Sequence, residues 1–222
     1  WIIRGRALSA VKIALYQVQP KDYFAWSKTE DKPYNENFDG GDFEDDIALA
    51  TYGKPKRQRA VPIGKKVYET TVPVGSENEA MIRVDLRKGL PAAGVGHLVA
   101  IAEPIETGLA KNKTTDQRFE PVRAWIQVTK LGASARIDGD DAHLQVYAVD
   151  TAHSLAPVAN ANTQLLRSDA VTVAGTATDT TGAAKLPLPP APPANAKPRK
   201  NNLSALLLAT AGADSVFVDV ST

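Results

Sequence analysis

Short runs that alternate between apolar and polar residues recur along most of the chain. The run from His143 to Val149 is the clearest, because Leu144 and Val146 alternate with polar side chains. A repeat of two places alternate side chains on opposite faces of a β-strand. Similar runs, with turn residues between them, predict an all-β architecture. The expected strands are 11–18, 47–52, 66–72, 79–86, 96–102, 122–129, 133–137, 143–149, 162–167, 175–178, 183–188, 203–210 and 215–220, and a helical turn is expected at 21–26.

The strand pattern lapses in the middle of the chain, where residues 111–118 contain no apolar side chain. We therefore expect two tandem immunoglobulin-like antiparallel β-sandwich domains, the first over residues 9–106 and the second over 121–222. Residues 107–120 are expected to link them, and residues 1–8 to be the end of a preceding domain or a linker. About seven strands in about 100 residues is typical of an immunoglobulin-like sandwich.

Two further stretches have loop chemistry. Residues 27–41 are acidic, polar and rich in glycine and asparagine. Residues 186–198 are rich in proline, which favours an extended polyproline II conformation over a hydrogen-bonded strand. A ligand for an aromatic-lined groove would have this composition, but strands are predicted on both sides of it, which favours a loop between strands.

Charge and composition exclude several classes of function. The 222 residues carry 26 basic and 25 acidic side chains, and the basic runs 54–59 and 197–200 are short and contain proline. Neither run forms the continuous basic surface that binds nucleic acid, so no nucleic-acid partner is expected. The absence of cysteine excludes disulfides, a thiolate nucleophile and zinc-cysteine sites.

The chain has no apolar run near the roughly 20 residues that a membrane-spanning helix needs. We therefore expect no direct membrane insertion by this chain. Its first residue is Trp1 rather than Met, and no signal-peptide pattern follows it. These features predict an internal fragment of a longer protein whose targeting signal lies elsewhere.

Two acidic clusters are candidate cation sites. Residues 138–141 read Asp-Gly-Asp-Asp, and residues 39–46 hold five carboxylates. Calcium prefers oxygen ligands, but an EF-hand distributes them over 12 residues and closes with a glutamate, which neither cluster does. We interpret the first as a tight hairpin and the second as a solvated loop, and predict no metal ligand.

No catalytic or cofactor-binding residue is predicted. The histidines His97, His143 and His153 lie on or beside expected strands and do not form an H-E-x-x-H motif, and no G-x-S-x-G sequence is present. Gly94 and Gly96 form a G-x-G, which indicates a turn because a third glycine and a following helix are missing. A hydrolase would require the fold to bring distant His, Asp and Ser residues together.

Several phrases of the sequence are similar to those of the bacterial α2-macroglobulin family. A strand ending in V-T-x-L-G is matched by Trp125 to Gly132, and a T-D-x-x-G turn by Thr178 to Gly182. Ser154 to Ala161 is similar to a G-x-P-x-x-x-A phrase, with serine in place of the usual glycine. Further similar phrases are 11–22, 90–103, 144–150 and 211–220.

The resemblance implies macroglobulin-type sandwiches within a periplasmic, broad-range protease inhibitor that is in some cases a membrane-anchored lipoprotein. In that family a protease cuts a bait segment, and one branch captures it through a thioester in a C-x-E-Q motif. Because the chain lacks cysteine, we expect a non-enzymatic framework that needs no cofactor. Its expected partners are target proteases, through the full-length protein, and neighbouring macroglobulin domains. The alternative is a tandem immunoglobulin-like adhesion or glycan-binding module of a cell-surface protein.

Overall fold

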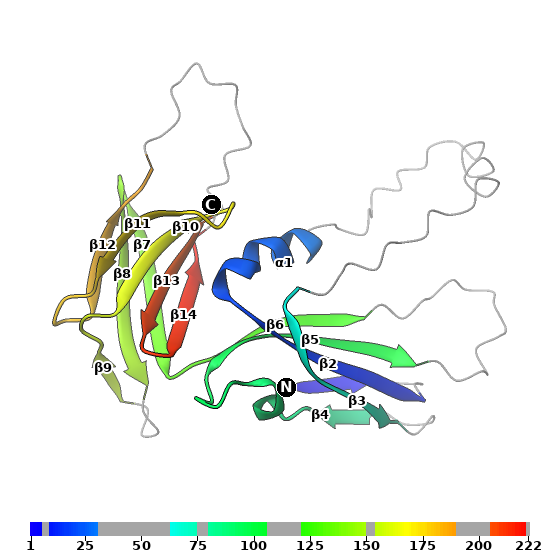
Figure 1. Cartoon of the computed structure of the whole chain (residues 1–222). Helices are drawn as coiled ribbons and strands as arrows, with labels where there is room; N and C mark the ends of the chain where they lie inside the picture. Colours follow the sequence, from blue (N-terminus) through cyan, green and yellow to red (C-terminus); the bar gives the residue numbers. More distant parts are fainter. Residues whose placement is uncertain are drawn as a thin grey trace, which may run out of the picture.

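The computed structural model describes residues 1–5, 9–30, 63–74, 80–105, 121–149, 154–189 and 205–220. Within them the chain is almost entirely β-structure, arranged as antiparallel sheets in two units (Figure 1). Each expected strand that falls on described residues is confirmed, but the one expected at 79–86 ends at Arg83, and a 3₁₀ turn begins at Leu86. The strand expected at 47–52, the loop at 39–46, the basic runs 54–59 and 197–200 and His153 lie outside the described residues.

The first unit is built on a four-stranded sheet with the order β3-β2-β5-β6. A smaller sheet of β1 and β4 covers one face of it. Alternate residues of β2, including Val11, Ile13 and Leu15, pack there against Ile3 and Ile82 of the small sheet. The strands are β1 (Ile2–Gly5), β2 (Ala10–Val18), β3 (Lys65–Pro73), β4 (Ala80–Arg83), β5 (Gly96–Ile105) and β6 (Val122–Val128).

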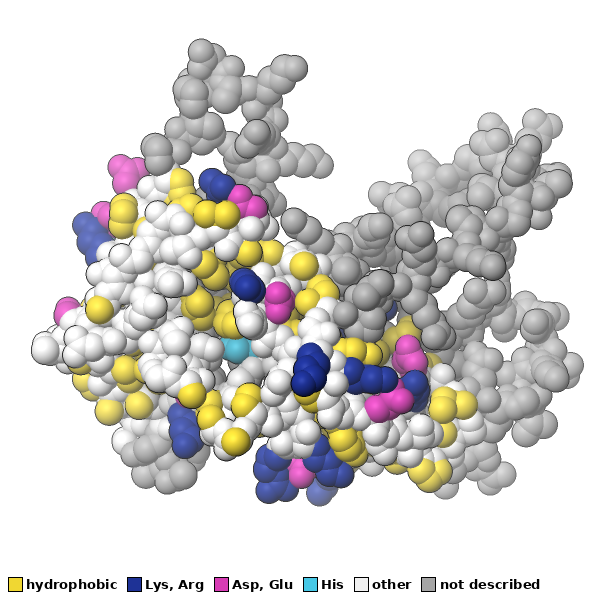
Figure 2. All heavy atoms as spheres, in the orientation of Figure 1, with side chains coloured by type: hydrophobic (Ala, Val, Ile, Leu, Met, Phe, Trp, Pro, Cys, Tyr) yellow, Lys and Arg dark blue, Asp and Glu magenta, His cyan; other side chains and the backbone are white. Residues whose placement is uncertain are grey.

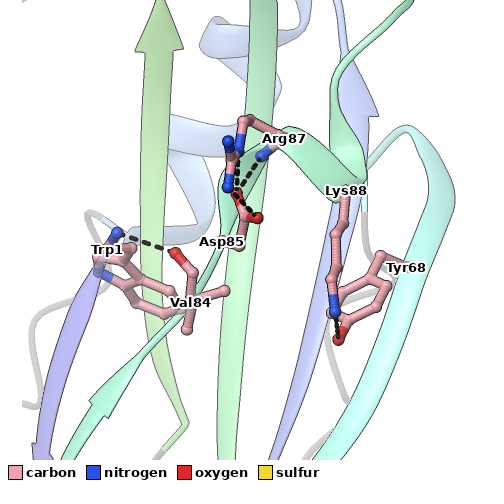
Figure 3. A network of polar contacts seen from close by, with 6 residues as sticks. All are labelled: Trp1, Tyr68, Val84, Asp85, Arg87 and Lys88. Atoms are coloured by element: carbon pink, nitrogen blue, oxygen red, sulfur yellow. Dashed lines mark hydrogen bonds and ion pairs between the residues drawn. The ribbon is translucent and has the colours of Figure 1, made fainter.

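The pairing of β1 corrects the expectation that residues 1–8 end a preceding domain or form a linker. Ile2 to Gly5 pair with β4. Trp1 and Val84 continue the pairing, because each backbone N–H donates to the other's carbonyl, at 3.2 and 2.8 Å (Figure 3). This strand therefore completes the first unit, a role that its four residues were too short to signal by alternation.

A 3₁₀ turn (η2, Leu86–Gly89) follows β4 and is held by its own polar groups. The Asp85 carboxylate accepts hydrogen bonds from the backbone and side chain of Arg87, which lowers the pKa of Asp85 to about 2 (Figure 3). Lys88 extends to Tyr68 on β3, with 3.2 Å between Nζ and the phenolic oxygen. These contacts tie the turn to the neighbouring strand.

The pairing of β6 also changes the expected domain boundary. The sequence placed 122–129 at the start of the second domain, after a linker at 107–120, but β6 pairs with β5 of the first unit from Val122 to Val128. Residues 106–120 lie outside the described residues. The connection between the units is instead Thr129-Lys130, because β7 begins at Leu131.

The second unit is a sandwich of two four-stranded sheets, one with the order β11-β10-β13-β14 and the other β12-β8-β7 with β9 beside β8. Its core lies between the sheets and includes Leu144, Val146, Leu165, Leu186 and Leu207. The strands are β7 (Leu131–Asp138), β8 (Asp141–Val149), β9 (Leu155–Pro157), β10 (Asn162–Arg167), β11 (Thr172–Ala177), β12 (Ala183–Pro187), β13 (Ala205–Ala211) and β14 (Asp214–Asp219). The acidic run 138–141 is the hairpin turn between β7 and β8, as expected.

A short helical segment follows β2, consisting of η1 (Pro20–Asp22) and α1 (Tyr23–Glu30). Pro20 suits the first helical position because it has no N–H to leave unpaired. Asp22 accepts a hydrogen bond from the Gln19 backbone at 2.8 Å and closes a capping box. The predicted helical turn at 21–26 is confirmed and extends further than expected.

The T-D-x-x-G phrase forms a tight turn before β12. Asp179 Oδ1 accepts hydrogen bonds from the backbone N–H groups of Thr181 (2.8 Å) and Ala183 (3.0 Å) and from the Thr181 hydroxyl. These bonds lower the pKa of Asp179. Thr178 Oγ1 accepts from the Ala161 N–H at 2.9 Å, and Gly182 has a φ of +79°. The threonine and aspartate of the T-D-x-x-G sequence are therefore explained by the hydrogen bonds they form in the turn, and the glycine by its positive φ.

Replacing Gly182 by alanine is expected to destabilise the protein by more than the roughly 1–2 kcal/mol that a left-handed alanine costs. An added Cβ would also lie 2.3 Å from the carbonyl oxygen of Val146, which belongs to the core strand β8. Gly139→Ala is the matched control, because φ there is +59° with open space around the Cβ position. Urea unfolding of the two variants measures the difference, and equal losses would contradict the proposed backbone clash.

Candidate functional site at the junction of the two units

The two units meet along faces that are apolar in both. In β13 the side chains of Leu207 and Ala209 enter the sandwich core, whereas Leu206 and Leu208 lie on the opposite face of the sheet. Leu206 is fully buried nonetheless. It is covered by the helical segment, which lies between the two units in Figure 1. The outer face of this sheet is therefore an interface.

Aromatic side chains from three separate parts of the chain fill this junction. Tyr23 of α1, Trp125 of β6 and Phe217 of β14 contact one another, with ring centroids 4.9–5.9 Å apart. Phe24 is buried in the same cluster with Leu206. Trp26 joins the rings on the side of the first unit. Edge-to-face and tilted pairs at these distances are favourable beyond the area they bury.

Gln127 of β6 joins the two units by a reciprocal pair of hydrogen bonds. Its Oε1 accepts from the backbone N–H of Phe217 at 3.1 Å, and its Nε2 donates to the carbonyl of the same residue at 3.3 Å. β14 is an edge strand of its sheet, so these backbone groups face away from β13. One side-chain amide thus pairs with both backbone groups of Phe217 at this sheet edge. Unpaired groups at an edge are otherwise free to bond another chain.

The connection between the units is short and is bonded into the second unit. The backbone N–H of Lys130 donates to Asp214 Oδ2 at 2.8 Å, and its carbonyl accepts from the N–H of Val149 at 2.8 Å. The Leu131 N–H donates to the Thr129 hydroxyl at 2.9 Å. The connection is therefore fixed to the second unit by hydrogen bonds.

His97, at the start of β5, is the one histidine at this junction among the described residues. Its side chain is 3% exposed and lies 5.6 Å from the Phe217 ring in a stacked arrangement. Its Nε2 is 3.0 Å from the hydroxyl oxygen of Ser215 on β14. Burial lowers the pKa of His97, and the nearby Ser215 and Asp214 oppose this shift without cancelling it. Burial therefore favours the neutral form of the ring.

The fold thus brings a distant histidine, serine and aspartate into one region, which was the condition for hydrolase chemistry. A triad needs a carboxylate hydrogen-bonded to the second ring nitrogen of the histidine. Within the described part of the chain, neither His97 Nδ1 nor Asp214 Oδ1 has a hydrogen-bond partner, so the two groups are not bonded to each other, and Asp214 Oδ2 accepts from the Lys130 N–H. The histidine-serine pair lacks its orienting group and is placed as an interface contact.

An open hollow of about 580 Å³ lies beside this pair. Its walls come from both units, with Pro20, Lys21 and Lys65 from the first and Ala213 and Ser215 from the second.

No group of three or more His, Asp or Glu side chains that could hold a metal occurs in the parts of the chain the structure describes.

Several of the surface charges in the described residues form ion pairs. Lys12 and Lys66 both contact Glu69, at 3.3 and 2.7 Å, and Arg167 contacts Asp169 at 2.5 Å. Figure 2 shows Lys and Arg side chains interspersed with Asp and Glu on this face rather than collected in one field. No helix in the described residues is long and apolar enough to cross a membrane.

Of the residues singled out from the sequence, His97 and Trp125 meet at the junction, whereas His143 lies on β8 of the second unit. Gly94 and Gly96 have φ of +73° and +150°, so the expected turn is confirmed. The sequence pattern did not single out Tyr23, Gln127 or Phe217 as junction residues. One signal was available: Leu206, Leu207 and Leu208 are consecutive apolar residues, which indicates a strand buried on both faces.

No family model matches the sequence, and no curated protein matches it. Solved structures do resemble the fold. A crystal structure of native alpha-2-macroglobulin from Escherichia coli that spans domains NIE-MG1 superposes with a TM-score of 0.56 at 14% identity. The match covers 99% of this chain and 87% of that fragment.

A second crystal structure of native Escherichia coli alpha-2-macroglobulin, spanning domains MG0-NIE-MG1, gives a TM-score of 0.57, also at 14% identity. The match again covers 99% of this chain, which spans 57% of that longer fragment. At this identity the likeness concerns the fold. The chain accordingly has an all-β, macroglobulin-like sandwich fold.

Replacing Gln127 by alanine is expected to open the edge of β14. The N–H and carbonyl of Phe217 would lose their partners, which costs about 1–3 kcal/mol for partly buried groups. Hydrogen exchange of the Phe217 amide should accelerate. Gln145→Ala is the matched control, because that side chain makes a 2.6 Å bond to the Thr181 carbonyl within the second unit. An unchanged Phe217 exchange rate in Gln127→Ala would contradict the role of Gln127.

Proposed function

We propose that this chain is a non-enzymatic framework segment of a bacterial alpha-2-macroglobulin-like protease inhibitor, with its bait and any thioester elsewhere in the longer protein. The observation that carries the proposal is the extent of the structural match. One superposition includes 99% of the chain and both of its units. A common immunoglobulin-like sandwich alone would account for only one unit at a time.

The junction supports the same proposal. A protease trap works by rearranging after cleavage, so its domains must transmit displacement to one another. Two units joined by Thr129-Lys130, an aromatic cluster and the Gln127 hydrogen bonds are in direct contact, so a displacement of one can be passed to the other. A tandem adhesion module has less need of such coupling, because its binding surfaces act separately. This difference favours the framework over the adhesion alternative.

The proposed partners are target proteases, met through the full-length protein, and neighbouring macroglobulin domains. The proposed location is the bacterial periplasm, to which the full-length protein is either secreted or anchored as a lipoprotein. No catalytic residue, metal or cofactor is proposed. The histidine-serine pair without an orienting carboxylate is consistent with a structural role.

The test uses the full-length protein that contains this chain. It is mixed with a broad-specificity protease and run on native and denaturing gels beside a sample pretreated with methylamine. We expect cleavage, compaction and retention of the protease. A denaturant-resistant conjugate that methylamine abolishes identifies the covalent branch, and compaction with retention but no conjugate identifies the non-covalent branch. If the protein neither compacts nor retains the protease, the proposal is overturned in favour of adhesion.

A further inference from the structure

Three features of His97 set it apart from an ordinary buried histidine. It belongs to the first unit, but its polar partner, Ser215, belongs to the second. Its ring stacks on Phe217, whose backbone is also hydrogen-bonded to Gln127. Its Nδ1 is buried with no protein acceptor among the described residues. The ring therefore belongs to the interface itself.

We propose that His97 makes the junction acid-sensitive: the neutral ring holds β14 against the first unit, and protonation of the ring releases it. This inference goes beyond the proposed function and does not depend on it. Protonation places a positive charge and a second N–H donor between aromatic rings. Burying an ionised group without a partner is strongly unfavourable, so separation of the units, which exposes the ring to water, becomes easier.

The charged groups around the ring do not compensate for this cost. On β14, the Asp214 carboxylate attracts the protonated ring: its Oδ2 accepts from the Lys130 N–H, and its Oδ1 is buried without a partner among the described residues. This attraction opposes the effect of burial on the His97 pKa without cancelling it. On η1, Asp22 is engaged by the Gln19 backbone and lies beside Lys21. The cross-strand neighbours on β2 and β6, Val18 and Gln127, are uncharged. The hollow beside the ring is also lined by Lys65, and Tyr23, which contacts Phe217, donates a hydrogen bond to Asp219.

The sign of the effect follows from the direction of the pKa. Burial lowers the pKa of His97 in the closed junction below its ordinary value of 6.5. The open junction then binds the proton more readily than the closed one. The closed junction is therefore most stable, relative to the open one, above pH 6.5, and it loses stability as the pH falls below 6.5. With an ordinary pKa in the open form, opening should become more favourable by up to about tenfold between pH 7.5 and 5.5, and the full amount is reached only if the closed form binds no proton in this range.

The experiment measures local opening by amide hydrogen exchange at pH 7.5 and 5.5. The Phe217 amide reports on the junction because it donates to Gln127, and the Val146 amide reports on the sandwich core because it donates to the Gly182 carbonyl at 2.9 Å. After correction for intrinsic exchange, we expect the ratio of the Phe217 rate to the Val146 rate to rise at pH 5.5, by up to about tenfold. A constant ratio would overturn the proposal.

Two variants assign the effect to one histidine. His97→Gln keeps a side chain that can bond Ser215 but does not titrate, so the rise in the ratio should disappear. His143→Gln should retain it, because His143 lies on the face of β8 that points away from the sandwich core. Persistence of the rise in His97→Gln would overturn the proposal.

A direct titration keeps the proposal testable if His97→Gln does not fold. The His97 ring protons of the unmodified protein are followed by NMR from pH 8 to 4. A pKa below 6.5, together with the rising exchange ratio, supports the switch. A pKa at or above 6.5 would overturn it, because the closed junction would then hold the proton as well as the open one does.

Discussion

Burial of the outer face of the β11-β10-β13-β14 sheet is the constraint on which the arrangement of the molecule depends. A sandwich normally buries one face of each sheet, but here Leu206 and Phe217 place a second apolar surface on the outside of this one. Burying a large apolar side chain contributes about 1.5–3 kcal/mol, whereas a typical hydrogen bond contributes about 0.5–1.5 kcal/mol. The apolar cluster therefore supplies most of the attraction between the units. The Gln127, Lys130 and His97 contacts fix their register.

Chain order makes this attraction effective. The helical segment follows β2 directly, so Tyr23 and Phe24 are delivered to the junction by the central sheet of the first unit. Trp125 and Gln127 come from β6, which ends only two residues before the second unit begins. Groups tethered this closely lose little further entropy when they pack, because the short connection has already restricted them. The junction is thus both apolar and preorganised.

Most of the strands and turns were predictable because neighbouring residues in the sequence determine them. Alternation located the strands to within a few residues, and the T-D-x-x-G phrase encodes its turn through Asp179 and Gly182. The partner of a strand is not local information: β6 alternates equally well whether it pairs with β5 or opens the next sandwich, and only the cross-strand pairing decides. The same holds for the site. His97 and Ser215 are 118 positions apart, and nothing in either local sequence indicates their contact.

The chemistry of the junction also explains why a histidine-serine contact need not indicate catalysis. A general base must reach substrate as well as nucleophile, and an orienting carboxylate must stabilise its protonated form. His97 is almost fully buried, and the nearby Asp214 is engaged by the backbone of Lys130. An environment that makes protonation costly is unsuited to a catalytic base that must accept a proton and hold it. The same environment suits a contact whose strength changes with the charge of one ring, which makes coupling between the units the property that the geometry best supports.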